Sequence, residues 1–176
     1  MKNGIDLVLR AAVFAAERHR GQRRKGADAA PFITHPLAVA RALTEEGGVQ
    51  DPELIAAALL HDTIEDTPTV RDDLAEAFGE RVAGLVVELT DDKRQPKQTR
   101  KAEQVRHAAH ISRDAQQVKL ADKLCNLREI LSNPPAGWPA ARRAEYFEWS
   151  RQVVDRMRGA NPALERAFDA AYEQCR

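Results

Sequence analysis

The residues best suited to metal chemistry lie in segments that are otherwise apolar. His61 and Asp62 close the segment AAALLHD, and Asp122 interrupts VKLADKL. Buried carboxylates are costly without a partner and repel each other unless positive charge lies between them. A divalent cation meets both needs, and His35, at the start of an earlier helix, can supply a fourth ligand. Asn126, one turn after Asp122, shares its face and can bind substrate or a ligand carboxylate.

The alternative for each of these residues is an ordinary structural role. A lone buried histidine is usually hydrogen-bonded within the core, and a lone buried aspartate is usually paired with arginine. The four together favour a metal site. Two imidazoles and two carboxylates leave room for water, and such mixed donors suit Mn, Fe, Co or Zn.

An acidic pair follows the second histidine in the segment HDTIEDT. Glu65 lies four residues after His61, so the two share a face if the helix continues. A carboxylate beside a metal can take a proton from the attacking water. The alternative is that Glu65 and Asp66 only end the helix before Pro68. We predict a catalytic role for the pair.

Two groups of basic residues point to an anionic ligand. The first precedes His35 and comprises Arg18, Arg20, Arg23, Arg24 and Lys25. The second comprises Lys93, Arg94, Lys97 and Arg100. Solvated surface runs are the ordinary explanation of such groups. Because the first leads into the helix that carries a candidate ligand, phosphate binding is the better interpretation, with arginine gripping phosphate in a bidentate manner and lysine acting as a point charge.

The overall composition limits the partners. The chain has 176 residues, with 27 Lys and Arg balanced by 27 Asp and Glu. A net charge of zero gives no general attraction to nucleic acid or to a membrane surface. No apolar stretch approaches the ~20 residues of a membrane-spanning helix, and two cysteines make no disulfide framework. We expect one domain over residues 1–176, in the cytoplasm, of undetermined oligomeric state.

The elements that must position these residues are helices. Aromatic residues make up only 5% of a chain rich in Ala, Leu, Arg and Glu, and no segment alternates like a strand. We expect an all-α bundle of about eight or nine helices. In the first, Leu7, Leu9, Val13, Phe14 and Ala16 form the predicted buried stripe. The expected helices cover residues 5–20, 36–46, 52–62, 70–77, 79–90, 98–111, 114–131, 139–158 and 161–174.

The order His, His-Asp, Asp resembles that of the HD-domain metal phosphohydrolases. The segments GQRRKG, FITHPLAVA, AALLHDTIEDT, VKLADKLCNL and EYFEW further resemble the hydrolase domain of the Rel/Spo alarmone enzymes. The stand-alone small alarmone hydrolases, including the metazoan type, are most similar. This resemblance covers residues 4 to 174 and implies an HD-domain helical fold. It also implies a Mn²⁺-dependent hydrolase that removes the 3′-pyrophosphate from guanosine tetra- or pentaphosphate (ppGpp or pppGpp).

The resemblance also implies roles for individual residues. The implied metal ligands are His35, His61, Asp62 and Asp122, and the implied catalytic pair is Glu65 and Asp66. The implied substrate contacts are Arg24, Lys25, Lys97, Asn126, Arg142 and Tyr146. Two other functions stay open, namely hydrolysis of another phosphorylated nucleotide such as NADPH and nucleotide sensing without turnover. A helical protein that binds nucleic acid fits poorly with zero net charge.

Overall fold

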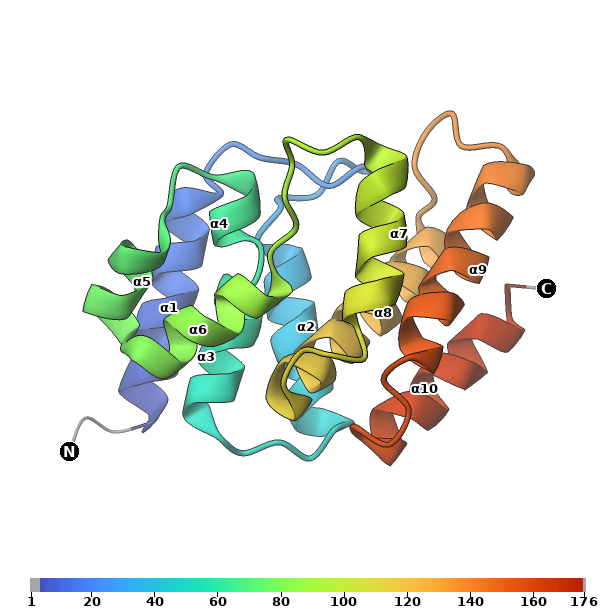
Figure 1. Cartoon of the computed structure of the whole chain (residues 1–176). Helices are drawn as coiled ribbons and strands as arrows, with labels where there is room; N and C mark the ends of the chain where they lie inside the picture. The colour runs from blue at the N-terminus through green and yellow to red at the C-terminus, as the bar shows by residue number, and fades with distance from the viewer. Residues whose placement is uncertain (1–3, 176) are drawn as a thin grey trace.

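The chain is all-α, as the sequence predicts. The computed structural model describes residues 4–175, which form ten helical segments and no named strand (Figure 1). Nine are longer helices, and α4 is a single turn. Their bounds are α1 (Gly4–Arg18), α2 (Thr34–Glu45), α3 (Pro52–Leu60), α4 (Thr63–Asp66), α5 (Arg71–Phe78), α6 (Glu80–Leu89), α7 (Lys97–His107), α8 (Arg113–Ser132), α9 (Ala140–Asp155) and α10 (Pro162–Glu173).

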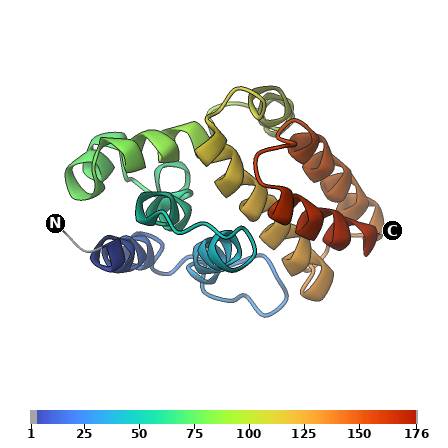
Figure 2. The ribbon, with the colours of Figure 1, turned by 90° about the horizontal axis from the view of Figure 1, so that it is seen from below.

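The short apolar helix α3 lies at the centre of one half of the molecule. Six of its nine residues are buried, because it packs against α1, α2, α6 and α8. In Figure 2 it is seen nearly end-on between α6 and the pair α1 and α2. Asp51 caps its start by accepting a hydrogen bond from the amide of Glu53 at 3.0 Å, and Pro52 takes the first turn, where its missing N–H costs nothing. The apolar centre and the caps of this helix follow directly from its sequence.

Helix α8 joins that half to the other. It contacts α2 and α6 on one side and α9 and α10 on the other. Val118, Leu120, Leu124 and Leu127 are fully buried along it, and Ser112 caps its start. The two ends of the described chain lie at opposite sides of the molecule in both views (Figures 1 and 2). No helix among residues 4–175 is long and apolar enough to cross a membrane.

Most predicted helix boundaries differ from the observed ones by one to four residues. Helix α2 begins at Thr34, two residues before Pro36, a shift typical of helix ends. Helix α3 ends at Leu60, two residues before its predicted end, and it does not continue to Glu65, because α4 starts a new turn at Thr63. The Thr63 hydroxyl donates to the Leu60 carbonyl at 2.7 Å, which closes the break between the two helices.

The predicted buried face of α1 is also partly wrong. Leu9 and Val13 are 60% and 59% exposed, whereas Ala11 and Ala15 are fully buried. The small alanines let α1 approach α3 closely. Leu7 and Phe14 do pack against the core, so the larger apolar side chains of α1 mark the packed face only in part.

Candidate active site

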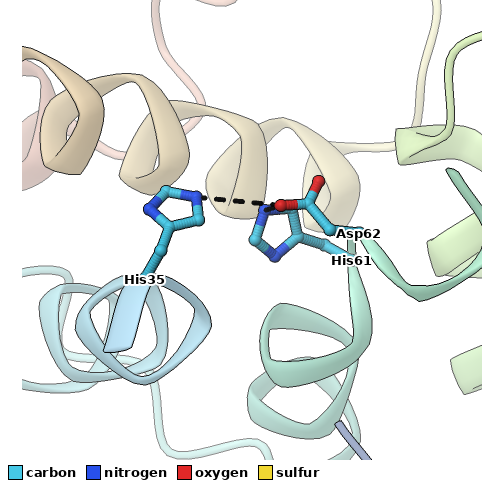
Figure 3. Close-up of side chains that lie close together, drawn as sticks. All are labelled: His35, His61 and Asp62. Atoms are coloured by element: carbon cyan, nitrogen blue, oxygen red, sulfur yellow. Dashed lines mark ion pairs between the residues drawn. The ribbon is translucent and has the colours of Figure 1, made fainter. Parts of the chain in front are cut away.

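Three separate parts of the fold bring the predicted metal ligands together. His35 lies in the first turn of α2, His61 and Asp62 form the break between α3 and α4, and Asp122 lies midway along α8. Donor atoms of His35, His61 and Asp62 all lie within 4.8 Å of one another. Figure 3 shows the Asp62 carboxylate facing the His35 ring beside His61. This spacing suits a shared cation.

Asp122 approaches both histidines of this cluster. Its Oδ1 atom lies 3.1 Å from Nε2 of His35 and 3.8 Å from Nε2 of His61. Nε2 of His61 is also 3.2 Å from Oδ2 of Asp62. Each histidine therefore turns the same nitrogen toward both carboxylates, as in a four-ligand site.

The tautomer of His61 fits a ligand role. Its Nδ1 lies 2.8 Å from the carbonyl oxygen of Ala58, which can only accept, so Nδ1 carries the proton. In the neutral imidazole Nε2 then has the lone pair that a cation would bind, and this buried atom makes no hydrogen bond to the described residues. Backbone-oriented imidazoles of this kind are the usual histidine ligands of metals. The residues present therefore fit a divalent cation.

The charges at the cluster also fit a cation. Without a cation, burial disfavours protonation of His61, but the attraction of Asp62 and Asp122 prevails and raises its pKa to about 9. Burial similarly disfavours ionisation of the two aspartates, yet His61 lowers the pKa of Asp62, and Lys123 and His35 lower that of Asp122. The two carboxylates thus remain negative and draw a positive charge between them.

Lys123 forms an ion pair with Asp122. This role of Lys123 was not predicted from the sequence. Its buried Nζ lies 3.3 Å from Oδ2 of Asp122 and 4.4 Å from the centre of the Trp149 ring. Asn126 donates to Oδ1 of Asp122 at 2.6 Å, in agreement with the prediction that it could bind a ligand carboxylate. Lysine and asparagine together orient this carboxylate, each through a different oxygen.

The two acidic residues of α4, Glu65 and Asp66, have different partners. Glu65 accepts a hydrogen bond from the backbone amide of Asp91 at 3.2 Å, and burial and the charge of Asp91 raise its pKa. Asp66 pairs with Lys93. Both acids face the cavity that also contains His61. The predicted closeness to the metal ligands therefore holds, although the helix does not continue between them.

A cavity of about 470 Å³ joins the candidate metal ligands to basic side chains. Arg23, Arg24, Lys25 and Lys93 line it together with all four proposed ligands, Glu65, Asp66 and Asn126. Arg18 and Arg20 do not line it. Arg18 instead lies over the Phe14 ring, and Arg94 pairs with Asp92 at the surface. Only part of each basic group thus reaches the cavity.

Arg24 is held firmly beside the ligands. Its Nε lies 2.9 Å from both carboxylate oxygens of Glu129, and its Nη2 donates to Oδ1 of Asn126 at 2.9 Å. Its guanidinium carbon lies 5.5 Å from the centre of the Phe32 ring. A phosphate that binds Arg24 must share this guanidinium with Glu129, a residue that sequence reasoning did not single out.

The remaining predicted contacts line a neighbouring cavity of about 350 Å³. Lys25, Glu65 and Tyr146 line both cavities, and Lys97 and Arg142 line the second. Burial lowers the pKa of Lys25, as do the nearby charges of Lys97 and Arg24. These positive side chains converge although sequence separates them widely. Further lining residues that sequence reasoning missed are Lys101, Trp138 and Trp149.

An all-α bundle that gathers two histidines and two aspartates in the order found here has the architecture of an HD domain. The HD domain family matches residues 11–146. The HD domain implies a divalent metal, and His35, His61 and Asp62 are placed to hold it.

Relatives that match over nearly the whole of both chains show to which group of HD-domain proteins the chain is similar. A guanosine-3′,5′-bis(diphosphate) 3′-pyrophosphohydrolase, MESH1, of Xenopus tropicalis is 49% identical over 98% of this chain and 96% of its own. The protein of the same name from Homo sapiens is 50% identical over 95% and 93%. A solved structure described as a metazoan ortholog of SpoT that hydrolyzes ppGpp is 43% identical, with a TM-score of 0.93 over 96% of this chain and 94% of that one. The chain belongs to the HD-domain family and, within it, to the small alarmone hydrolases of the Rel/Spo group.

Proposed function

We propose that this protein hydrolyses guanosine 3′,5′-bis(diphosphate) and its pentaphosphate counterpart to GDP or GTP and pyrophosphate. The observation that carries the proposal is the single cavity shared by the candidate metal ligands and six lysine and arginine side chains. Relatives of about 50% identity carry the name of this activity. A substrate with two diphosphate groups needs both a cation and several positive side chains.

The metal is Mn²⁺ in this proposal, with His35, His61, Asp62 and Asp122 as its ligands. The cation would supply positive charge to the phosphate oxygens and make a water molecule more acidic. Mixed nitrogen and oxygen donors are compatible with Mn²⁺. Lys123 and Asn126 keep the Asp122 carboxylate turned toward the two histidines.

In the proposed reaction, Glu65 and Asp66 act on the attacking water. A water oxygen forms a bond to the phosphorus next to the ribose, the bond from that phosphorus to the 3′ oxygen breaks, and the 3′ oxygen ends as a hydroxyl. Glu65 is suited to accept the proton of the water, because its burial favours the protonated form. Asp66, which pairs with Lys93, orients the water.

Basic and aromatic side chains bind the rest of the substrate. Arg24 and Lys25 bind the 3′-diphosphate beside the candidate ligands in this proposal, while Lys97 and Arg142 bind the second diphosphate. The Tyr146 ring packs against Trp138 and Trp149, with centroid distances of 5.9 and 5.3 Å. Such an aromatic group offers a flat face to a nucleobase. Asn126 contributes a polar contact to the substrate beside Asp122.

The partner in this proposal is a small-molecule nucleotide. We also propose one domain that acts in the cytoplasm and binds neither nucleic acid nor membranes.

A comparison of substrates tests the proposed function. Metal-free protein is supplied with Mn²⁺ and then incubated separately with guanosine tetraphosphate, NADPH and deoxynucleoside triphosphates, and the released pyrophosphate and phosphate are measured. Pyrophosphate from guanosine tetraphosphate alone is the expected result. Faster release of phosphate from NADPH would favour the other phosphohydrolase activity. Binding of guanosine tetraphosphate without turnover, with metal bound, would favour a sensor. The Asp122→Asn variant serves as the inactive control.

A further inference from the structure

Gln22 links the turn that carries the acidic pair to the helix that carries a metal ligand. Its side-chain amide donates to the carbonyl oxygen of Asp66 at 2.8 Å. Its backbone carbonyl accepts from the amide of Phe32 at 3.0 Å, and the Phe32 carbonyl accepts from the amide of His35 at the same distance. One glutamine therefore connects α4 to the start of α2.

The turn that Gln22 contacts has little support of its own. Helix α4 has only four residues, and a single helical turn is unstable in isolation. The last carbonyls of a helix also lack partners within it. Thr67 hydroxyl and amide groups both bond the carbonyl of Thr63, and Gln22 bonds that of Asp66. Gln22 thus caps the end of the turn that presents Glu65 and Asp66.

His19 fixes the orientation of the Gln22 amide. Because a carbonyl can only accept, the NH₂ group of Gln22 must face Asp66 and its Oε1 must face His19. Nδ1 of His19 lies 2.8 Å from that Oε1, so Nδ1 carries the donated proton. The His19 ring is 3% exposed and stacks on Phe32 with a centroid distance of 4.5 Å.

Among the described residues, the His19 imidazole makes one hydrogen bond, which is the bond to the side chain of Gln22. Nε2 is buried and makes none, and burial lowers the pKa of the ring. A phenylalanine would fill the same space against Phe32 without burying a polar nitrogen, which carries a cost. The contact with Gln22 is therefore what an imidazole adds at this position.

From these contacts we propose that His19 and Gln22 are positioning residues for the acidic pair. His19 orients the Gln22 amide, which in turn holds the Asp66 peptide and keeps the carboxylates of α4 at a fixed distance from the ligand helix α2. The proposal rests on the proposed hydrolysis for its catalytic consequence. Displacement of a reacting group by about 1 Å can cost ~100-fold in rate.

The test uses Gln22→Leu, with Gln116→Leu as the matched control. Gln116 also caps a helix end, since its Nε2 donates to the carbonyl of Ala108 at 2.9 Å, but it lies outside the cavity. For Gln22→Leu we expect kcat for guanosine tetraphosphate to fall ~10- to 100-fold, with KM and Mn²⁺ affinity within about threefold of wild type. The control keeps its kcat.

Two histidine variants add a rescue measurement. His19→Phe keeps the stacking and loses the donor, so it should lower kcat in the same way as Gln22→Leu. His19→Asn retains an N–H group close to the position of Nδ1. We expect it to recover most of the lost kcat, which a merely structural role for the ring would not explain.

Hydrogen exchange of the metal-free protein tests the positioning without any turnover. The amides of Asp66 and Thr67 bond to carbonyls within the turn, so Gln22→Leu should speed their exchange more than that of α3 amides. Equal acceleration throughout the chain, or local acceleration with an unchanged kcat, would overturn the proposal. If wild type does not hydrolyse guanosine tetraphosphate, the proposed function fails, and the exchange pattern alone then decides whether Gln22 holds the turn.

Discussion

The Nζ atom of Lys123 lies 3.3 Å from Oδ2 of Asp122, and Lys123 is only 4% exposed. A buried lysine beside a candidate metal ligand has two effects. It neutralises part of the charge of a carboxylate that burial would otherwise protonate, and it leaves the other oxygen directed at the two histidines. The pair therefore prepares the site before a cation binds.

Replacement of this lysine should destabilise the metal-free protein. Lys123→Met leaves Asp122 without its buried partner, a change that typically costs about 3–5 kcal/mol of unfolding free energy. Saturating Mn²⁺ should recover part of the loss, because the cation replaces the missing positive charge. Urea unfolding with and without Mn²⁺ measures both. Lys119→Met is the control, since Nζ of Lys119 donates to the carbonyl of Leu89, and its loss should show no metal-specific recovery.

Loss of a ligand charge should remove the metal. Asp122→Asn keeps the shape of the side chain but weakens the interaction with a cation, so bound metal and turnover should both be lost while helix content stays near wild type. Metal analysis and circular dichroism of the purified variant give the result. Stoichiometric Mn²⁺ in this variant would show that Asp122 is not a ligand.

The affinity for metal should depend on pH through His61. In the metal-free protein its pKa is raised to about 9, so the imidazole is protonated at pH 7 and must lose that proton to bind a cation. The dissociation constant of Mn²⁺ should therefore fall ~10-fold per pH unit between pH 7 and 8. An ordinary histidine, with a pKa of about 6.5, would show little change there. Calorimetric titrations in two buffers also count the released proton, and a constant affinity over this range would contradict the prediction.

Arg24 and Glu129 should have opposite effects on substrate binding. Arg24→Ala removes a charge-assisted phosphate contact worth about 1.5–3 kcal/mol, so kcat/KM should fall ~10- to 100-fold. Glu129→Gln removes the carboxylate that competes with phosphate for the guanidinium, so KM should fall. Steady-state kinetics of both variants test this. Arg20→Ala, in the same loop but outside the cavity, is the control, and equal losses for Arg20 and Arg24 would exclude a direct contact.

The candidate ligands could be predicted because charge is rare in apolar helices. His61, Asp62 and Asp122 each interrupt an apolar run, and that signal is local in sequence. Lys123 gave no such signal, because a helical lysine is usually exposed and its burial here depends on the packing of α9 through Trp149. The contact of Gln22 could not be predicted either, since its partner lies 44 residues away.

The fold class was also predictable, although one packed face was not. Proline and capping residues marked the start of α3 correctly. In α1 large apolar residues lie on more than one side, so the pattern could not tell that Ala11 and Ala15 would pack while Leu9 and Val13 remain exposed. Close helix contact favours small side chains, which hydrophobicity alone does not reveal.

The acidic pair offers the sharpest distinction between a hydrolase and a nucleotide sensor. Four other side chains are available to hold the cation, so neither Glu65 nor Asp66 is needed for that purpose. Burial raises the pKa of Glu65, which suits it to receive a proton, while Asp66 is paired with Lys93. Loss of both charges should thus affect proton transfer and leave metal and substrate binding intact.

The double variant Glu65→Gln and Asp66→Asn tests that separation. Its amides keep the size of the side chains, and the amide oxygen that replaces the Glu65 carboxylate can still accept from the Asp91 amide, so the turn should persist. We expect kcat for guanosine tetraphosphate to fall by ~10²–10⁴, the usual effect of losing a general base, with KM and bound Mn²⁺ near wild type because proton removal belongs to the transition state. Normal turnover would show that the two residues only end the helix. Loss of the bound metal would show that at least one of them is a metal ligand.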